Sequence, residues 1–201
     1  MLVLASASPR RRELLAQLGC EVAVIPSAVH EERAPGESPA AYARRLAWDK
    51  AHAVAARRDA HVTGASAIVA ADTIVVIDGA VLEKPAGRAD AERIIALLAG
   101  RTHEVITAVC VMQPGAGVAL ERFEVSTRVT FRPLDAREIA GYCATREPYD
   151  KAGAYAAQGI GASLIARIDG SYTNVVGLPL AETVQALQRH GLFDPFAAPA
   201  P

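Results

Sequence analysis

A cluster of hydroxyl and guanidinium side chains lies near the start of the chain, in the segment SASPRRR. Ser8 followed by Pro9 predicts a helix start, because a serine hydroxyl caps free N–H groups and proline fits the first helical turn. Arg10 and Arg11 then fall in that turn, where positive charge opposes the helix dipole unless an anion compensates it. Together with Ser6 they fit a phosphate-binding cradle, although this segment alone equally fits arginines that are merely solvated.

A lysine lies on the apolar side of the next predicted helix, which begins at Ser38-Pro39. Tyr42, Leu46 and Lys50 follow one another at four-residue steps and therefore share one face. The ammonium group of Lys50 either reaches water from the edge of the core or points into a binding site.

A carboxylate interrupts the otherwise apolar predicted strand AIVAADTIVVI. Burial of Asp72 requires a partner, and a structural ion pair is as well supported as a functional carboxylate. Lys84 is the nearest candidate partner in the sequence, on the strand that returns after the Asp78-Gly79 turn. A two-residue turn would place Lys84 opposite Thr73 and on the other face from Asp72, unless the strand end flares or the turn is longer.

Two further segments contain candidate ligand-binding residues with weaker signals. Glu31 and Glu32 are adjacent acids in a polar loop, and such residues are usually only solvated. The segment EPYDKAGAYAAQGIGASL places Gln158 among glycines and small residues, which allow a ligand to approach the backbone closely. Its glycine spacing matches neither the phosphate-loop nor the dinucleotide-binding fingerprint.

The composition restricts the class of protein. The chain has 201 residues, of which 51% are hydrophobic and 21% charged, so it can bury a substantial core. A net charge of −1 provides no overall attraction to nucleic acid or to anionic membranes. The widely spaced Cys20, Cys110 and Cys143 fit reduced structural thiols. With no apolar run long enough for a membrane span or signal peptide, we expect a cytoplasmic protein without nucleic-acid or membrane partners.

Strand and helix patterns alternate along the chain, which predicts an α/β fold. The sheet must be mixed, because the Asp78-Gly79 hairpin joins antiparallel strands. We expect one domain over residues 1–192 and a flexible tail over residues 193–201. Strands are predicted at 1–5, 20–25, 66–77, 103–112, 124–131, 162–168 and 172–176, and helices begin near residues 8, 38, 90, 135 and 179.

In combination, these segments resemble the Maf-type nucleoside triphosphate pyrophosphatases over nearly the whole chain except the tail. The resemblance implies a mixed sheet flanked by helices with a central cleft, as in Maf and ITPase-like folds, and a homodimer. It also implies cleavage between the α- and β-phosphates of a nucleoside triphosphate with Mg²⁺ or Mn²⁺. The matching stretches are SASPRRRELLAQLG, the loop glutamate before ESPAAYARRLAWDKA, AADTIVVIDGAVLEKP, LAGRTHEVITAV, YDKAGAYAAQG and GSYTNVVGLPLAET.

The same resemblance assigns roles to the candidate residues. Asp72 matches the catalytic aspartate of the family and Glu31 the loop acid that completes the site. Either acid can serve as the base for the attacking water, and both are candidate metal ligands. Lys50 and Lys84 match lysines that neutralise phosphate charge. The matches to triphosphate-binding positions are Ser6, Ser8, Arg10 and Arg11, with Arg10 also at a position linked to substrate choice.

Substrate preference within the family follows from two further matches. Thr73 and Gln158 match the subgroup that acts on dTTP and UTP, and by implication on modified pyrimidine nucleotides. A side-chain amide complements the uracil edge, since it offers one donor and one acceptor. The alternatives are a 7-methyl-GTP pyrophosphatase, which Gln158 disfavours, and a non-catalytic nucleotide-sensing inhibitor of septum formation, which the retained acids and lysines disfavour. Two departures are His30, which replaces a common acid beside Glu31, and Asp49, which replaces a common glutamate.

Overall fold

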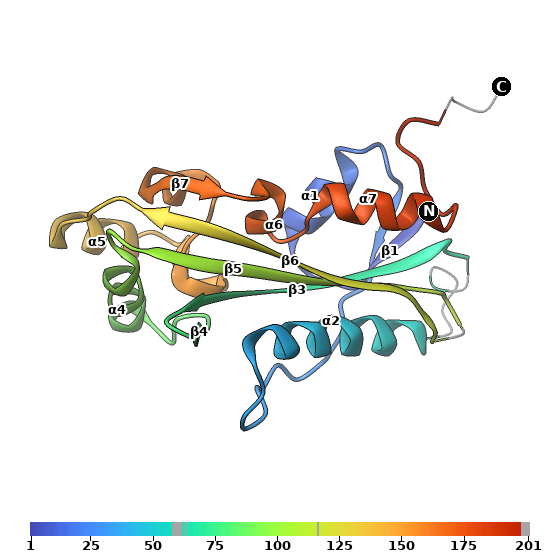
Figure 1. Cartoon of the computed structure of the whole chain (residues 1–201), viewed down its shortest axis with the longest axis horizontal. Coiled ribbons are helices and arrows are strands. Elements are labelled where there is room, and N and C mark those ends of the chain that lie inside the picture. Colours follow the sequence, from blue (N-terminus) through green and yellow to red (C-terminus); the bar gives the residue numbers. More distant parts are fainter. Residues whose placement is uncertain (58–61, 63, 116, 198–201) are drawn as a thin grey trace. The chain divides into compact units, whose positions relative to one another are not determined.

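The computed structural model describes residues 1–57, 62, 64–115 and 117–197, so residues 198–201 of the predicted tail lie outside the described part. Its strands form a seven-stranded mixed sheet in the order β2-β1-β3-β5-β6-β7, with β4 paired to β3 (Figure 1). The α/β fold with a mixed sheet is therefore confirmed, whereas the central cleft and the domain limits 1–192 stay predictions.

The chain divides into two compact units, which are described separately. Strands β3, β5 and β6 contribute residues to both units. Unit 1 comprises the described residues of Met1–Asp72, Ala108–Glu124 and Gly177–Pro201, and unit 2 comprises Thr73–Thr107 and Val125–Val176.

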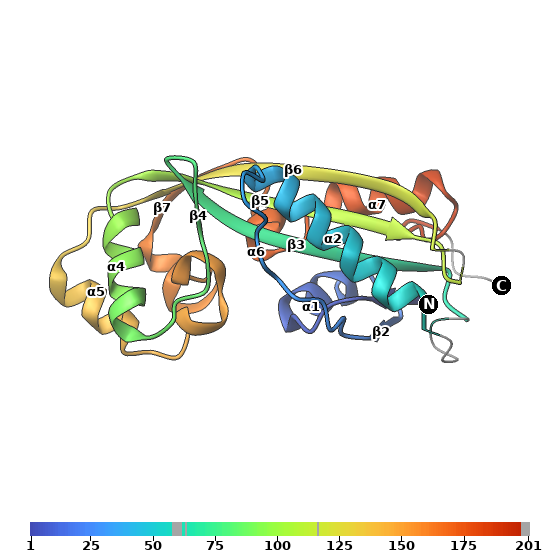
Figure 2. The same cartoon turned by 90° about the horizontal axis from the view of Figure 1, so that it is seen from below.

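Unit 1 is organised around a buried parallel strand, β1, which pairs with β2 on one side and β3 on the other. Helix α2 lies on one face of these strands and helix α7 on the opposite face (Figures 1 and 2). Its elements are β1 (Leu2–Leu4), α1 (Pro9–Ala16), β2 (Val22–Val24), α2 (Pro39–Ala55), β3 (Ala67–Ile77) as far as residue 72, β5 (Thr102–Met112) from residue 108, β6 (Ala119–Phe131) as far as residue 124, and α7 (Leu180–Arg189).

The starts of α1 and α2 follow the sequence signals. The Ser8 hydroxyl accepts the N–H of Arg11 at 3.5 Å, and the Ser38 hydroxyl accepts the N–H of Ala41 at 3.3 Å. Each cap is followed by a proline, whose missing N–H costs nothing in the first turn.

Unit 2 packs helices and short turns against the other halves of β3, β5 and β6. Its core includes Ile95, Leu98, Val129 and Phe131, each no more than 1% exposed. Its further elements are β4 (Ala80–Leu82), α4 (Arg88–Leu98), β5 (Thr102–Met112), β6 (Ala119–Phe131), α5 (Ala136–Cys143), three 3₁₀ turns η1 (Pro148–Asp150), η2 (Ala152–Ala154) and η3 (Gly159–Leu164), β7 (Ile165–Asp169) and α6 (Tyr172–Val176).

The hairpin of unit 2 has the register expected for a two-residue turn. Val75 pairs with Leu82 and Ile77 with Ala80. Asp78 and Gly79 have positive φ values of 51° and 77°, as a type I′ turn requires. The predicted capping box of α5 is also present, because Asp135 and Glu138 exchange side-chain and backbone hydrogen bonds.

The prediction of a strand over residues 172–176 is wrong, because this segment forms helix α6 (Tyr172–Val176). The Ser171 hydroxyl accepts the N–H of Asn174, and the Ser171 carbonyl accepts the N–H of Val175. The buried Asn174 amide donates to the Val105 carbonyl and to the Thr127 hydroxyl. These long-range contacts outweigh the strand preference of the β-branched residues.

The predicted strand over residues 162–168 begins three residues too early. Residues 162–164 belong to the 3₁₀ turn η3, and β7 starts at Ile165. The Glu147 carboxylate accepts the N–H groups of Ile160 and Gly161, and the Ser163 hydroxyl donates to the Ile160 carbonyl. These bonds hold the chain in turns before it can extend.

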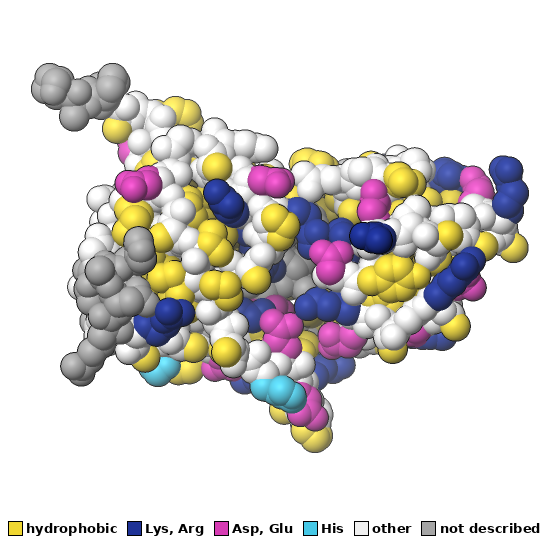
Figure 3. Space-filling view, turned by 180° about the vertical axis from the view of Figure 1, so that it is seen from behind, with side chains coloured by type: hydrophobic (Ala, Val, Ile, Leu, Met, Phe, Trp, Pro, Cys, Tyr) yellow, Lys and Arg dark blue, Asp and Glu magenta, His cyan; other side chains and the backbone are white. Residues whose placement is uncertain are grey.

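The surface charges and the state of the cysteines are those expected from the amino-acid composition. On the face drawn in Figure 3, basic and acidic side chains are interspersed, consistent with the net charge of −1. Among the described residues, no helix combines the length and apolarity needed to cross a membrane. Cys20, Cys110 and Cys143 are buried free thiols, as expected.

A histidine is buried in unit 2. His103 is 3% exposed, its Nε2 lies 2.8 Å from the Tyr155 hydroxyl, and its ring meets Phe131 edge-on at 5.1 Å. Burial lowers the pKa of His103 from 6.5 to about 4, because the charged ring would lose its hydration. His103 is therefore neutral in the folded protein at neutral pH.

The pKa of His103 predicts a loss of stability in mild acid. The unfolded chain binds a proton near pH 6.5 and the folded chain only near pH 4, so this contribution is complete above pH 6.5 and lost as the pH falls toward 4. Replacing His103 with Gln should remove roughly 2 kcal/mol of the change in unfolding free energy between pH 7.5 and 4.5. Urea unfolding at both pH values checks this, with His52→Gln as an exposed control. Equal pH dependence in wild type and His103→Gln would contradict it.

Candidate active site

Helix α2 places a lysine inside unit 1. Tyr42 and Leu46 are each 1% exposed on the same face, and Lys50 is 7% exposed. The four-residue spacing therefore predicted the position of this side chain correctly. A buried ammonium requires compensating negative charge, which fixes what must surround it.

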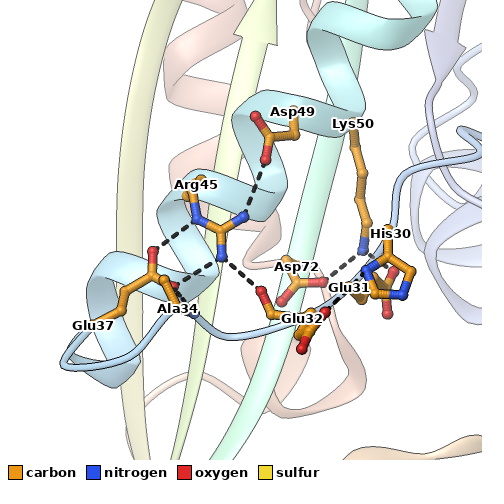
Figure 4. A network of polar contacts seen from close by, with 9 residues as sticks. All are labelled: His30, Glu31, Glu32, Ala34, Glu37, Arg45, Asp49, Lys50 and Asp72. Atoms are coloured by element: carbon orange, nitrogen blue, oxygen red, sulfur yellow. Dashed lines mark hydrogen bonds and ion pairs between the residues drawn. The ribbon is translucent and has the colours of Figure 1, made fainter.

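Two carboxylates provide that charge. The Nζ of Lys50 lies 2.6 Å from Oδ1 of Asp72 on β3 and 2.5 Å from Oε1 of Glu31 in the loop before α2 (Figure 4). Asp72 is 6% exposed, whereas the side chain of Glu31 is 41% exposed. The structure thus brings together Glu31, Lys50 and Asp72, and Glu31 is more than a solvated loop acid.

The segment at the start of α1 belongs to the same unit. Arg11 donates from Nη1 to the Ser6 hydroxyl at 3.0 Å and from Nε to the Gly177 carbonyl at 2.8 Å. The Ser6 hydroxyl also accepts the N–H of Ser8 at 3.2 Å. Burial lowers the pKa of Arg11, and the charges of Asp72 and Glu31 oppose that shift. Arg11 is therefore a partly buried cation near the two acids rather than a solvated arginine.

The other arginines of this cluster are more open. Arg10 is partly exposed and Arg12 is exposed on α1. Arg10 lies in the first turn of α1, at the end of the helix that carries partial positive charge. Its own positive charge is unfavourable there and adds to the attraction for an anion.

The remaining predicted site residues belong to unit 2. The Thr73 hydroxyl lies 2.9 Å from that of Thr107, which in turn donates to the Asn174 carbonyl at 3.0 Å. Thr73 follows Asp72 in β3, so the two side chains point to opposite faces of the strand. A role for Thr73 in specificity stays a prediction.

Lys84 follows the last paired residue of the hairpin. Strand β4 ends at Leu82, and the Glu83 carbonyl accepts the N–H of Gly153. Lys84 thus lies two residues beyond the last paired residue of β4, and its pairing with Asp72 stays a prediction. The side chain of Lys84 is exposed.

The loop that carries Gln158 is held by a carboxylate that the sequence did not single out. Glu147 accepts the N–H groups of Ile160 at 2.8 Å and Gly161 at 2.9 Å. A Cβ at Gly161 would lie 2.4 Å from the Ala156 carbonyl oxygen, so only glycine fits there. Gln158 is thus presented, partly exposed, from a tightly packed turn.

The acids of unit 1 suit a divalent cation. Magnesium and manganese prefer oxygen ligands, and Mg²⁺ commonly takes one or two carboxylates together with substrate phosphates. Glu31 and Asp72 approach one ammonium from two elements, so their oxygens converge. In the described part of the chain, no group of three or more His, Cys, Asp or Glu side chains is arranged to hold a metal alone.

The model of the family described as Maf-like protein matches residues 1–190, which include every site residue discussed above. The chain belongs to this family. The resemblance seen in the sequence is confirmed.

Several curated proteins are similar to this chain over nearly their whole lengths. A protein named dTTP/UTP pyrophosphatase from Geobacter sulfurreducens is 53% identical over 190 residues, covering 94% of this chain and 96% of the relative. Proteins of the same name from Anaeromyxobacter sp. and Vibrio cholerae are 50% and 48% identical, covering 98% and 94% of this chain and 93% and 97% of theirs. A HAM1 protein structure from Coxiella burnetii aligns over 94% of this chain and 95% of its own, with 16% identity and a TM-score of 0.45.

The position of Lys50 between two acids predicts the effect of removing it. Lys50→Met leaves Asp72 buried without its ammonium partner, and breaking such a pair should lower the unfolding free energy by about 3 kcal/mol. Adding Asp72→Asn should recover part of this loss, because it removes the unpaired charge. Urea unfolding of both single variants and the double variant tests this. Losses that simply add in the double variant would contradict it.

Proposed function

We propose that this Maf-like protein is a nucleoside triphosphate pyrophosphatase that converts dTTP and UTP to the nucleoside monophosphate and pyrophosphate. The observation that carries the proposal is the placement of Lys50 between Asp72 and Glu31, with Arg11 nearby. The name shared by relatives about 50% identical over nearly the whole chain supports this substrate class.

The proposed reaction is attack of water on phosphorus with rupture of the α–β phosphoanhydride. The water proton passes to the carboxylate of Asp72 or Glu31, and the pyrophosphate carries away the electron pair of the broken P–O bond. Lys50 offers its positive charge to the non-bridging oxygens, on which negative charge is concentrated. No covalent enzyme intermediate is needed.

The triphosphate is bound by the cationic start of α1. Ser6, Ser8, Arg10 and Arg11 provide hydroxyl and guanidinium donors there, and the mutual hydrogen bonds of Ser6, Ser8 and Arg11 hold that segment in shape. The family resemblance also assigns Lys84 to the neutralisation of phosphate charge. Such preformed donors reduce the ordering that the substrate would otherwise require.

Glu31 and Asp72 would hold the Mg²⁺ or Mn²⁺ ion. When bound, the ion neutralises phosphate charge and lowers the pKa of a coordinated water. Lys50 contributes by binding one oxygen of each carboxylate, which holds Glu31 and Asp72 close together before the substrate binds.

Base recognition is assigned to Gln158, with Thr73 as a second contributor. The Gln158 amide can donate to O4 and accept from N3–H of uracil or thymine. Its loop is fixed by Glu147 at Ile160 and Gly161, so the amide is presented from a constrained backbone. The homodimer and the cytoplasmic location that we expect stay predictions.

A substrate panel tests the proposed reaction. With Mg²⁺ or Mn²⁺, we expect dTTP and UTP to give monophosphate and pyrophosphate, resolved by ion-exchange chromatography, while CTP, dCTP, ATP, GTP and 7-methyl-GTP react at least tenfold more slowly. Asp72→Asn should lower kcat by roughly 10²–10⁴-fold, the usual contribution of a general base. The control is Asp78→Asn, an exposed turn residue paired with Arg101.

The outcomes of this panel separate the alternatives. Preference for 7-methyl-GTP would keep the reaction and reject the pyrimidine assignment. Binding of nucleotide without turnover would reject the enzyme and favour a nucleotide sensor. Full activity of Asp72→Asn would reject the role of that carboxylate.

The assignment of Gln158 predicts a change in selectivity without loss of the chemistry. Gln158→Leu should lower kcat/KM for UTP by about 10–100-fold, because one or two hydrogen bonds to the base are lost. The ratio of UTP to CTP turnover should approach one. Steady-state kinetics with both nucleotides measure this, and Gln185→Leu on the exposed side of α7 is the control. An unchanged ratio would remove Gln158 from base recognition.

A further inference from the structure

The loop that carries Glu31 has no regular secondary structure to hold it. It connects β2 to α2 over residues 25–38, and both Glu31 and Glu32 are exposed. A carboxylate on such a segment can approach Lys50 in a fixed geometry only if other contacts restrain the backbone. Those contacts come from one arginine on α2.

Arg45 binds this loop at two places (Figure 4). Its Nη2 donates to the carbonyl of Glu32, the residue after Glu31, at 2.9 Å. Its Nε and Nη2 donate to the two carboxylate oxygens of Glu37, each at 2.8 Å. This is the paired arrangement for which the planar guanidinium group is suited.

Further contacts fix the orientation of the Arg45 guanidinium group and of the Glu37 carboxylate. Nη1 of Arg45 lies 3.4 Å from Asp49, and the guanidinium carbon lies 5.6 Å from the Tyr42 ring centroid. Oε2 of Glu37 also accepts the N–H of Ala34 at 3.1 Å, and the Glu37 carbonyl accepts from Arg33. The loop is thereby closed on itself as well as tied to α2.

The Glu37 carboxylate that binds Arg45 is ionised at neutral pH. The hydrogen bonds from Arg45 hold the pKa of Glu37 at about 2, well below its ordinary value. Its carboxylate therefore stays ionised and bound to the guanidinium at neutral pH.

Arg45 and Lys50 are on the same helix and restrain the same loop. Arg45 holds the backbone directly after Glu31, and Lys50 holds its carboxylate. We propose that Arg45 is a positioning residue that sets the Glu31 carboxylate for its part in catalysis and cation binding, acting only through the loop. This inference rests on the proposed function, because it assumes that Glu31 works in that reaction.

Arg45→Lys is the informative variant. Lysine keeps the charge but is a single point donor that cannot bridge the Glu32 carbonyl and both Glu37 oxygens. Arg44→Lys is the matched control, because Arg44 is the adjacent residue and pairs with Glu124 at 2.7 Å, away from the loop. Both substitutions are made in the full chain, and thermal unfolding confirms that each variant is folded.

The decisive measurement is a double-mutant cycle with Glu31→Gln. Arg45→Lys alone should lower kcat/KM for UTP by about 10–100-fold and weaken Mn²⁺ binding to the nucleotide-free protein, measured by electron paramagnetic resonance, at least tenfold. In the Glu31→Gln background the same substitution should change either quantity by less than about twofold, because its target is already gone. If Arg45 had only a general structural role, Arg45→Lys would lower kcat/KM and Mn²⁺ affinity by the same factor in the wild-type and Glu31→Gln proteins. That result would overturn the inference.

Hydrogen exchange separates this inference from the proposed function. The amide of Ala34 should exchange faster in Arg45→Lys and remain as protected as wild type in Arg44→Lys. If wild type hydrolyses no nucleotide, the proposed function fails, and the exchange and Mn²⁺ results alone then decide the role of Arg45. Unchanged exchange together with unchanged Mn²⁺ binding would reject it.

Discussion

The ammonium of Lys50, enclosed between two carboxylates, is the constraint on which the organisation of unit 1 depends. A lysine that is 7% exposed on the apolar face of α2 is tolerated only with opposite charge at contact distance. Asp72 meets this requirement from within β3, and Glu31 meets it from the loop. The packing of α2 against β3 places Asp72 beside the Lys50 ammonium, and the course of the loop places Glu31 there. Both arrangements therefore provide the negative charge that the buried ammonium requires.

Two of the loops that carry predicted site residues are each held by one charged side chain, a guanidinium in one loop and a carboxylate in the other. Arg45 donates to a carbonyl and a carboxylate beside Glu31, while Glu147 accepts two backbone N–H groups beside Gln158. In each case several hydrogen bonds converge on one planar group, which fixes orientation better than isolated contacts do.

Local signals in the sequence predicted much of this arrangement. Ser8 and Ser38 with the prolines after them gave correct helix starts, and the four-residue spacing placed Lys50 correctly on the buried face. The helical state of residues 172–176 was missed, because it depends on the long-range bonds of Asn174 as well as on the local hydrogen bonds accepted by Ser171. The hydrogen bonds from Arg45 to Glu32 and Glu37 were also missed, because both partners lie in a loop without a periodic sequence pattern.

The chain crosses between the two units at four peptide bonds, one of which joins Asp72 to Thr73 within β3. Glu31, Lys50 and Asp72 all belong to unit 1, whereas Thr73 and Gln158 belong to unit 2. The buried charges of Glu31, Lys50 and Asp72 are therefore balanced within a single packing unit, and a substitution at Gln158 changes the other unit.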